Sequence, residues 1–462
     1  MKRYREIHQR IRVSILDGEL VAGDRLPPAR TLAADLGVAR GTVDAAYSLL
    51  AAEGLLVSRG RNGTFVSTSA GLLDRSPTPV SVQAPAQPGG DPEDLRYLFE
   101  APLPLTPGLP SFDHFPRKLW YRTVARAGRH AGVSHLSYPD PFGLPTLRQA
   151  IASHLAVARG IRCSPEQIVV TAGYLGALAL VCRAVLESGA PAWIEAPGYS
   201  FTRHAVVMVG GQPVPVPVDS DGLDVDAALE AEPQARLCIV APSHQFPSGH
   251  SLSLPRRAAL LDWAAQSGGW IVEDDYAGEF RYVGQPLPAL KSLDKADRVF
   301  YIGTFSKTMF PGLRIGYLVV PSTQFPRIRD LVRRLDGGRS ILEQGALADF
   351  MIEGHFARHV RRMRALYASR RSVLIAAVSD AFGSRFEIMP TAGGLHIVAR
   401  AGDHESDVAM EYAAGAAGVR PLALSKMGQG LDCGQGLLLG FGNLPEEQAG
   451  SAVERLKMAI GG

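Results

Sequence analysis

The chain has 462 residues, a formal net charge of +3, and 46% hydrophobic and 20% charged residues. This length provides for several domains with a large core, and the composition is that of a globular protein rather than a disordered one. The chain starts directly with an amphipathic pattern, and no apolar run reaches the length of a membrane span. The four cysteines are scattered, without the close pairs of a metal site. We therefore expect a cytoplasmic protein with no metal site and no membrane segment.

Residues 1–67 predict a compact helical module followed by a hairpin. Apolar residues recur every three or four positions from Tyr4 to Ile15, which is the pattern of an amphipathic helix. Two shorter helices follow, and the second begins close to Arg40, after a glycine break. Residues 55–66 are typical of two strands around a glycine-rich turn. This order predicts a helix-turn-helix with a wing.

The module resembles the DNA-binding domain of the GntR superfamily over its whole length. The resemblance rests on Gly-Asp-Arg-Leu-Pro at 23–27, Arg-Thr-Leu-Ala at 30–33, Leu-Gly-Val-Ala-Arg-Gly-Thr-Val at 36–43 and Gly-Arg-Asn-Gly-Thr-Phe at 60–65. It implies that the residues that contact DNA are Arg30, Arg40, Thr42, Arg59 and Arg61. The first turn of a recognition helix meets base edges in the major groove, which supports Arg40 and Thr42 independently. The alternative is a helical bundle whose arginines are merely solvated, but the wing and the glycines favour DNA binding.

Residues 68–98 are rich in proline, glycine and serine and lack the periodicity of a core. We expect a linker here, between a winged helix at 1–67 and a second domain at 99–462. A flexible chain of about 30 residues spans roughly 30 Å, close to the ~34 Å between DNA half-sites one turn apart. Such a linker can let one body present two winged helices to an operator.

Residues 168–178 predict a strand that runs into a helix through a turn at Gly173. Helix N-termini bind phosphate because their first amides are free and the helix dipole is positive there. The backbone amides of Gly173, Tyr174 and Leu175 are therefore candidate phosphate ligands. The alternative is an ordinary structural turn.

An acid and a phenol end the apolar run at 270–273. This run predicts a buried strand that delivers Asp274 and Tyr276 to its carboxyl end, where ligands bind in open α/β sheets. An aspartate at this position suits a cofactor with a pyridine ring, because its negative charge keeps the ring nitrogen protonated.

Lys307 lies in the run Thr-Phe-Ser-Lys-Thr-Met-Phe-Pro-Gly-Leu-Arg at 304–314. A lysine flanked by hydroxyls, with an arginine seven positions on, suits a Schiff base to pyridoxal 5'-phosphate (PLP). Thr304, Ser306 and Arg314 supply donors for the phosphate of this cofactor. The strand, acid, phenol, lysine and arginine in this order predict a PLP site.

These segments resemble the fold-type I aminotransferases over roughly residues 105–460. The resemblance implies an α/β domain in which Lys307 binds PLP covalently. It also implies that Tyr199 contacts the cofactor ring and that Tyr138 is lent to the phosphate of a neighbouring subunit. A site shared in this way implies a homodimer. The alternative for Tyr199 is an ordinary exposed tyrosine after a Pro-Gly turn.

The sequence departs from these aminotransferases at two positions that matter for catalysis. Phe246 stands where the family carries the asparagine that binds the phenolate oxygen of the ring. We expect this role to pass to Tyr276, with His244 or Gln245 as possible helpers. The strand at 436–443 also lacks the arginine that grips a substrate carboxylate. We therefore expect a vestigial aminotransferase-like domain with at most residual transaminase activity. The sequence does not identify the arginine that replaces the missing one, and Arg420 is the neighbouring candidate.

The order of winged helix, linker and aminotransferase-like domain resembles the MocR family of bacterial transcriptional regulators across essentially the whole chain. This resemblance implies a multidomain, PLP-dependent regulator that binds operator DNA as a head-to-tail homodimer. The resemblance also implies that the protein senses PLP or an amino compound through Lys307. Two other hypotheses stay open. A working aminotransferase with an accessory DNA-binding domain predicts multiple turnover, and a dimerisation scaffold with a disused site predicts no cofactor.

Overall fold

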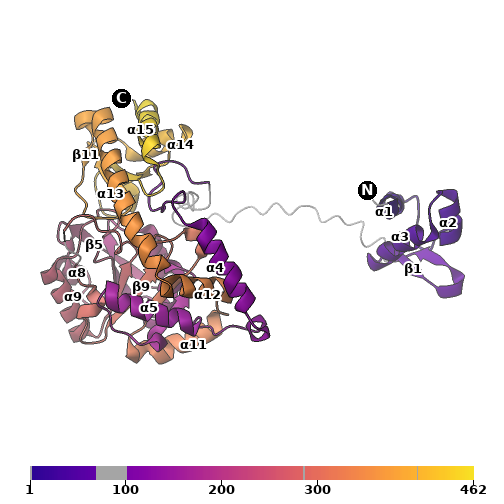
Figure 1. Cartoon of the computed structure of the whole chain (residues 1–462), viewed down its shortest axis with the longest axis horizontal. Helices are drawn as coiled ribbons and strands as arrows, with labels where there is room; N and C mark the ends of the chain where they lie inside the picture. The colour runs from indigo at the N-terminus through magenta and orange to yellow at the C-terminus, as the bar shows by residue number, and fades with distance from the viewer. Residues whose placement is uncertain (1–2, 69–100, 285–286, 403, 462) are drawn as a thin grey trace. The chain divides into compact units, whose positions relative to one another are not determined.

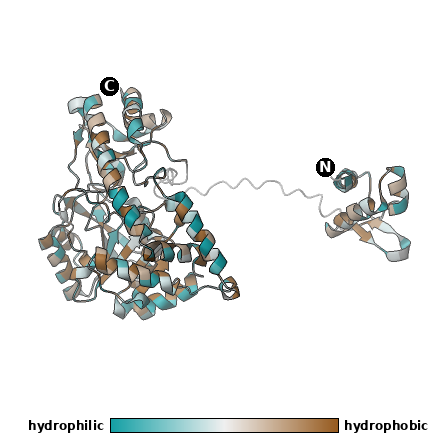
Figure 2. Cartoon of the chain, viewed as in Figure 1, coloured by the Kyte–Doolittle hydropathy of each residue, from teal (hydrophilic) through white to brown (hydrophobic). Residues whose placement is uncertain are grey.

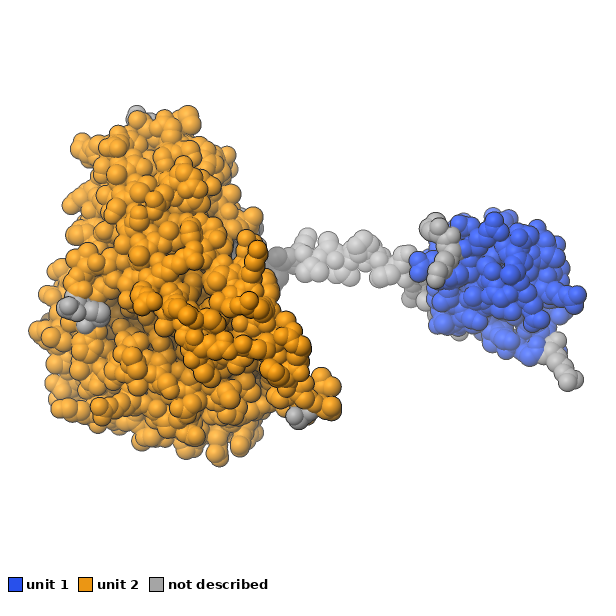
Figure 3. All heavy atoms as spheres, viewed as in Figure 1, with its two compact units in different colours: residues 1–96 blue, residues 97–462 orange. Residues whose placement is uncertain are grey.

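The computed structural model describes residues 3–68, 101–284, 287–402 and 404–461. The chain forms two compact units, residues 1–96 and 97–462 (Figure 3). The linker predicted at 68–98 lies outside the described residues, apart from Thr68. No helix in the described ranges combines the length and the apolar content that a membrane crossing needs.

The first unit is a helix-turn-helix with a wing. Its elements are α1 (Arg3–Leu16), α2 (Ala29–Asp35), α3 (Arg40–Ala52), β1 (Leu56–Ser58) and β2 (Thr64–Val66). Val43 and Leu50 of α3 are fully buried in its core. Gly37 has a φ of 61°, a left-handed conformation that L side chains rarely adopt, and it lets the chain turn from α2 into α3. β1 and β2 pair antiparallel as the wing.

The second unit contains an eight-stranded sheet in the order β3-β10-β9-β8-β7-β4-β5-β6. Its strands are β3 (Ile168–Thr171), β4 (Pro191–Ala196), β5 (Gln212–Asp219), β6 (Gly222–Leu223), β7 (Leu237–Val240), β8 (Trp270–Asp275), β9 (Val299–Thr304) and β10 (Gly316–Val319). Strands β9, β8, β7, β4 and β5 are parallel, whereas β10 is antiparallel to both β3 and β9. Strands β3 and β9 therefore point the same way, and the carboxyl ends of β3, β4, β7, β8 and β9 meet at one edge.

Helices cover both faces of this sheet (Figure 1). They are α4 (Arg117–His130), α5 (Pro145–Ala158), α6 (Tyr174–Val185), α7 (Ser200–Met208), α8 (Val225–Ala231), α9 (Leu254–Ser267), α10 (Leu290–Leu293), α11 (Phe325–Leu335), α12 (Ile341–Ile352) and α13 (His355–Phe382). Successive side chains of a strand point to opposite faces, so Val272 packs with α6, α7 and α11 while Ile271 packs with α8 and α9. Figure 2 shows mixed hydrophilic and hydrophobic residues along these helices, as expected when one side of a helix lies in the core.

The C-terminal part folds around a four-stranded antiparallel sheet in the order β11-β12-β14-β13. Its elements are β11 (Glu387–Ile388), β12 (His396–Arg400), α14 (Asp407–Ala416), β13 (Leu422–Ala423), β14 (Gly436–Gly440) and α15 (Glu446–Ile460). Helix α13, 28 residues long, runs from the large sheet to this subdomain (Figure 1). Leu374 of α13, Leu439 of β14 and Leu456 of α15 share one buried cluster, which fixes the small sheet beside the large one.

Candidate cofactor site and nucleic-acid interface

The predicted cofactor residues gather at the carboxyl edge of the large sheet. Asp274 is the fifth residue of β8, and Lys307 follows the end of β9 by three positions. Thr171 at the end of β3 pairs with Gly316, which pairs in turn with Thr304 at the end of β9. The sheet thereby brings the glycine turn after β3 beside the segment that carries the lysine.

Lys307 is held against the backbone of a distant segment. Its Nζ donates to the carbonyl oxygen of Gly108 at 2.8 Å, and a Cβ on Gly108 would lie 3.0 Å from that Nζ. Desolvation lowers the pKa of the Lys307 amine to about 8, and the charge of Asp274 opposes this shift. An amine with this pKa is partly neutral at pH 7, and the neutral form is the nucleophile.

Asp274 faces the side of the sheet that α6 covers. Burial raises the pKa of its carboxyl to about 8, Asp275 adds to the shift, and the positive charge of Lys307 opposes it. The Tyr174 hydroxyl of α6, which lies 3.1 Å from Thr202 Oγ1, also acts to lower the pKa of Asp274. The next residue, Asp275, faces the other side and pairs with Arg159 at 2.6 Å. A protonated ring nitrogen is the kind of cation that would stabilise Asp274 as an anion, so this residue fits a pyridinium.

Tyr276 offers a buried hydroxyl that has no hydrogen-bond partner among the described residues. Burial raises the pKa of this phenol well above its usual value, so it stays protonated and can donate. A buried hydroxyl without an acceptor costs about 1–3 kcal/mol. Tyr276 therefore fits a ligand that brings an oxygen acceptor, as the ring of PLP does.

The turn after β3 exposes backbone amides at the edge of the sheet. Gly173 has a φ of 80° and precedes α6, which begins at Tyr174. The first amides of a helix, here those of Tyr174 and Leu175, have no acceptor within the helix. A Cβ on Gly316 would lie only 2.8 Å from the Cα of Gly173, so glycine at 316 lets the turn pack against β10.

Arg314 brings a guanidinium to the same turn. It adopts a left-handed φ of 51°, and its Nη2 donates to the carbonyl oxygen of Ala172 at 3.0 Å. Its Nη1 lies 3.9 Å from the position that a Cβ on Gly173 would take. Thr304 and Ser306 lie in the adjacent turn, where the Ser306 amide donates to the Thr304 hydroxyl at 3.2 Å. We call Thr304, Ser306, Arg314 and the first amides of α6 the phosphate cradle, because one cation, two hydroxyls and free amides suit a phosphate dianion.

Three aromatic side chains line one wall of the pocket. The ring of Tyr199 lies 5.8 Å from that of Phe246 and 6.1 Å from that of Tyr174. These three residues border a single cavity together with Asp274 and Glu195. Tyr199 therefore lies where it can contact a ring that is paired with Asp274, and Tyr174 contributes its side chain as well as its amide.

Two further residues, Glu195 and His396, lie at this site although the sequence did not indicate them. Glu195 lies on β4, where burial raises the pKa of its carboxyl to about 8. His396 comes from β12 of the C-terminal subdomain, is 2% exposed, and hydrogen-bonds through Nε2 to the Pro247 carbonyl oxygen at 2.9 Å. Burial and, to a smaller extent, the charge of Lys307 lower the pKa of His396 to about 4. Glu195 lies four positions before Tyr199 in the sequence, which was a usable signal, whereas nothing local pointed to His396.

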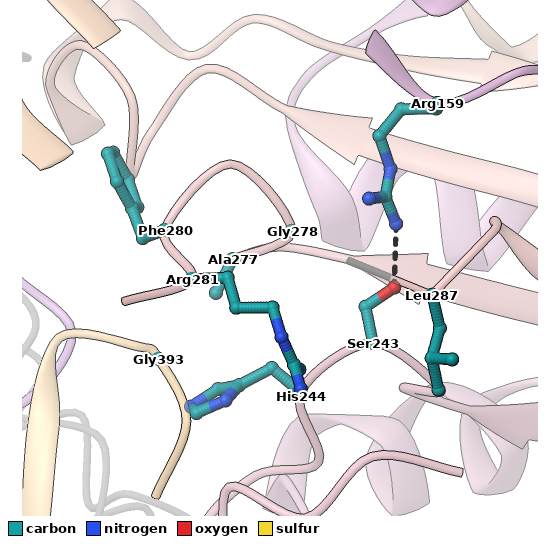
Figure 4. Close-up of a pocket in the computed structure, with 9 residues that line it drawn as sticks. All are labelled: Arg159, Ser243, His244, Ala277, Gly278, Phe280, Arg281, Leu287 and Gly393. Carbon is teal, nitrogen blue, oxygen red and sulfur yellow. Dashed lines mark hydrogen bonds between the residues drawn. The ribbon is translucent and has the colours of Figure 1, made fainter. Parts of the chain in front are cut away.

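His244 and Gln245 have surroundings of their own. The Gln245 amide nitrogen donates to the carbonyl oxygens of Pro197 at 2.6 Å and Phe246 at 2.5 Å, so this side chain holds the turn in place. Burial lowers the pKa of His244 to about 3, which keeps it neutral. His244 lines a small polar pocket with Arg281, and Figure 4 shows both reaching into it from separate segments.

Tyr138 and Arg420 do not line the cavity that Tyr199 and Asp274 border. Tyr138 is 96% exposed, close in sequence to Leu136, which is 86% exposed. Arg420 donates through its backbone to the Pro104 carbonyl oxygen at 2.8 Å and through Nη1 to that of Ala101 at 3.4 Å. The strand that lacks the carboxylate arginine, β14, is fully buried.

The candidate DNA contacts on the helices of the first unit are open to solvent. Arg40 is the first residue of α3 and is exposed, with its Nε 3.4 Å from Asp44. Thr42, in the same turn, is partly exposed, and Arg30 is exposed in the first turn of α2. The structure therefore leaves these side chains accessible to a DNA groove.

The wing carries an exposed arginine beside an aromatic ring. The guanidinium carbon of Arg59 lies 5.1 Å from the centre of the Phe65 ring. The side chain of Arg61 lies outside the described residues.

Known proteins resemble both units. Residues 3–66 match the bacterial regulatory proteins of the gntR family, and residues 104–415 match the aminotransferases of class I and II. The chain is 36% identical to the "Probable rhizopine catabolism regulatory protein MocR" of Rhizobium meliloti, over 99% of this chain and 93% of that protein. The chain belongs to the MocR family of GntR-type transcriptional regulators.

One further relative supports this assignment, and one solved structure supports the fold of the second unit. The pyridoxine biosynthesis transcriptional regulator PdxR of Corynebacterium glutamicum is 35% identical over 96% of this chain and 92% of its own length. A kynurenine aminotransferase of Pyrococcus horikoshii superposes with a TM-score of 0.73 and 25% identity, over 84% of this chain and 98% of that one. The fold class predicted for this MocR-family protein, a winged helix joined to a fold-type I aminotransferase-like domain, is confirmed.

Proposed function

We propose that this MocR-family regulator binds PLP at Lys307 and that occupancy of this pocket changes its affinity for operator DNA. The observation that carries the proposal is the grouping of three residues in unusual states. Burial lowers the pKa of Lys307 to about 8 and raises that of Asp274 to about 8, and the hydroxyl of Tyr276 is buried without a partner among the described residues. The aminotransferase of P. horikoshii was solved in complex with PMP, which supports the same use of this fold.

Each residue of the pocket has one task in this proposal. PLP, when bound, supplies an aldehyde that reacts with amines and a ring that withdraws electrons. The phosphate cradle would hold the phosphate, and Tyr199 would contact the ring. Asp274 would keep a proton on the ring nitrogen, and Tyr276 would donate to the ring oxygen. Lys307 would act as the nucleophile, because desolvation releases its proton near neutral pH.

The effector in this proposal is PLP itself or an amino compound that competes with Lys307. Leu437, Leu438 and Leu439 of β14 are buried and apolar, so this strand offers no guanidinium for a substrate carboxylate. Arg420 is tied to backbone carbonyls of a separate segment. The lack of an arginine for a substrate carboxylate on β14 favours PLP as the effector and at most residual transamination. The name of the C. glutamicum relative, a pyridoxine biosynthesis regulator, points the same way.

We also propose a head-to-tail homodimer in the cytoplasm, with the winged helix at 1–67, the linker at 68–98 and the effector domain at 99–462. Tyr138 is almost fully exposed, which suits a side chain that reaches the phosphate of a neighbouring copy. A difference in contacts between the two states of the pocket is what would shift the population of dimers that can bind DNA.

The test measures DNA affinity with and without PLP. Duplexes that bind the full-length protein are selected from a random-sequence pool, and their affinity is followed by fluorescence anisotropy. We expect PLP to change the affinity of the wild type at least about fivefold and to leave Lys307→Ala unchanged, with Lys118→Ala on the exposed start of α4 as the control. Equal wild-type affinities with and without PLP would contradict sensing at this pocket. Multiple-turnover release of a keto acid would favour a working aminotransferase instead.

A further inference from the structure

The backbone segment that contains Arg25 lies beside the β1–β2 hairpin that forms the wing. The backbone of Arg25 bridges to Phe65 of β2, and Phe65 pairs on its other side with Val57 of β1. Paired residues of neighbouring strands point to the same face of a sheet, so Arg25, Phe65 and Val57 share one face. The opposite face is buried in the core of the unit and consists of Leu26, Leu56 and Val66.

Two guanidiniums lie on the outward face. Arg59 is two positions beyond Val57 and therefore points the same way, with its guanidinium carbon 5.1 Å from the centre of the Phe65 ring. The guanidinium of Arg25 crosses the end of the hairpin, since its Nε lies 2.9 Å from the position that a Cβ on Gly63 would take. Gly63 has a φ of 105°, a backbone conformation that favours glycine.

Neither guanidinium has an acidic partner in the described part of the first unit. The ion pairs found there join Arg12 to Glu53, His8 to Glu53 and Arg40 to Asp44. Arg25 and Arg59 are both exposed. An exposed guanidinium without a carboxylate partner is available for the paired hydrogen bonds that arginine makes to phosphate oxygens.

The segment that carries Arg25 is also fixed to the recognition helix. Tyr47 of α3 donates its hydroxyl to the carbonyl oxygen of Pro27 at 2.8 Å. Pro27 is only two residues beyond Arg25, so the position of the Arg25 backbone is set relative to α3. When α3 enters a groove, the outward face of the wing keeps a constant place beside it.

We propose that Arg25 joins Arg59 and Phe65 in a phosphate-binding face of the wing, which contacts the DNA backbone beside the groove that α3 enters. We call these three residues the wing face. Such contacts orient a protein on the duplex without reading bases, so they act on any sequence. The inference rests on the DNA-binding role of the first unit and adds Arg25, which lies outside the helix-turn-helix.

The test is the salt dependence of binding to DNA that has no operator. Full-length protein is titrated onto a labelled duplex of mixed sequence, about 30 base pairs or roughly three turns long, in NaCl from about 50 to about 200 mM. The proteins compared are the wild type, Arg25→Gln, the charge-preserving Arg25→Lys, and Arg12→Gln. Arg12 is the matched control, because it belongs to the same unit but is paired with Glu53.

For Arg25→Gln we expect the slope of log K against log salt to be shallower by about 0.9 for each winged helix that contacts the duplex, because one counterion fewer is released. The ratio of wild-type to variant affinity should therefore shrink about 3.5-fold per winged helix over this salt range. Arg25→Lys and Arg12→Gln should keep the wild-type slope. Melting temperatures are recorded for all four proteins.

An Arg25→Gln protein with the wild-type slope and melting temperature would overturn the proposal. The wing face would then be expected to bind an acidic protein surface instead of DNA. Should Arg25→Gln fail to fold, Arg59→Gln tests the same face and should show the same change in slope. Absence of any DNA binding by the wild type would instead contradict the DNA-binding role of the first unit.

Discussion

The two units place their candidate functional residues in opposite surroundings. In the winged helix, Arg30 and Arg40 are exposed, and the structure surrounds them with solvent. In the lysine pocket, Lys307 and Asp274 have pKa values moved toward each other by desolvation. A surface that meets a large, charged partner keeps its cations in water until binding, because ion pairs exposed to water are weak and easily exchanged.

A pocket that performs covalent chemistry has the opposite requirement. It must hold an amine that is neutral near pH 7 and an acid that becomes charged when a cation arrives, and only a desolvated site does this. On the proposed function, the first unit therefore depends on exposure and the second depends on burial. Four changes test this contrast, from the largest expected effect to the smallest.

Lys307→Ala should abolish covalent attachment of PLP. The reason is that, among the described residues, the amine beside the Gly108 carbonyl is that of Lys307. Noncovalent binding through the phosphate cradle should persist at lower affinity. Absorption spectra of the variant titrated with PLP check both points, with Lys118→Ala as the control. A visible band of wild-type intensity in Lys307→Ala would place the reactive amine elsewhere.

Asp274→Asn should weaken PLP binding about 10- to 150-fold, because a hydrogen bond that involves a charged group contributes roughly 1.5–3 kcal/mol. The amide keeps the size of the side chain but cannot become an anion beside the ring nitrogen. Equilibrium titration with PLP measures the change, and Asp262→Asn on the exposed side of α9 is the control. Undiminished affinity would remove Asp274 from the site.

Arg40→Ala should reduce binding to a selected operator by about 1–3 kcal/mol, roughly 5- to 150-fold, if this residue reads a base. Its weak, exposed pairing with Asp44 at 3.4 Å leaves it able to turn toward DNA. Anisotropy titrations of the operator and of one with substituted half-sites separate loss of affinity from loss of specificity. Unchanged operator affinity would contradict the assignment.

The rate of PLP attachment should rise about tenfold per pH unit below pH 8 and level off above it. The reason is that only the neutral amine reacts, and the pKa of Lys307 is lowered from 10.5 to about 8. Stopped-flow absorbance from pH 6 to 10, about four units, records this profile. A rate that climbs without a break toward pH 10 would indicate an ordinary lysine.

Much of the first unit could be predicted because its contacts are local. The spacing of apolar residues gave the helices, and the glycines at 37 and 63 marked the turns that the structure places at left-handed φ values. The bridge from Arg25 to Phe65 could not be predicted in this way, since it joins positions forty residues apart and leaves no period in the sequence.

The lysine pocket was predictable only in part. Asp274 and Tyr276 were found because a buried strand ends there, and Lys307 because its neighbours are hydroxyls and a turn. Gly108 and His396 reach the pocket through tertiary packing of segments far from Lys307 in the chain, and neither carries a local signal. The roles assigned to the individual residues of both sites stay predictions until they are measured.

The central claim is that Lys307 is the residue to which PLP binds. The most direct measurement is the visible absorption spectrum of the full-length protein with PLP before and after borohydride reduction, followed by peptide mass mapping. The account predicts a band that borohydride removes and a single pyridoxyl group on Lys307. A protein that stays colourless and unlabelled in excess PLP would contradict the account and leave a DNA-binding protein with a disused enzyme fold.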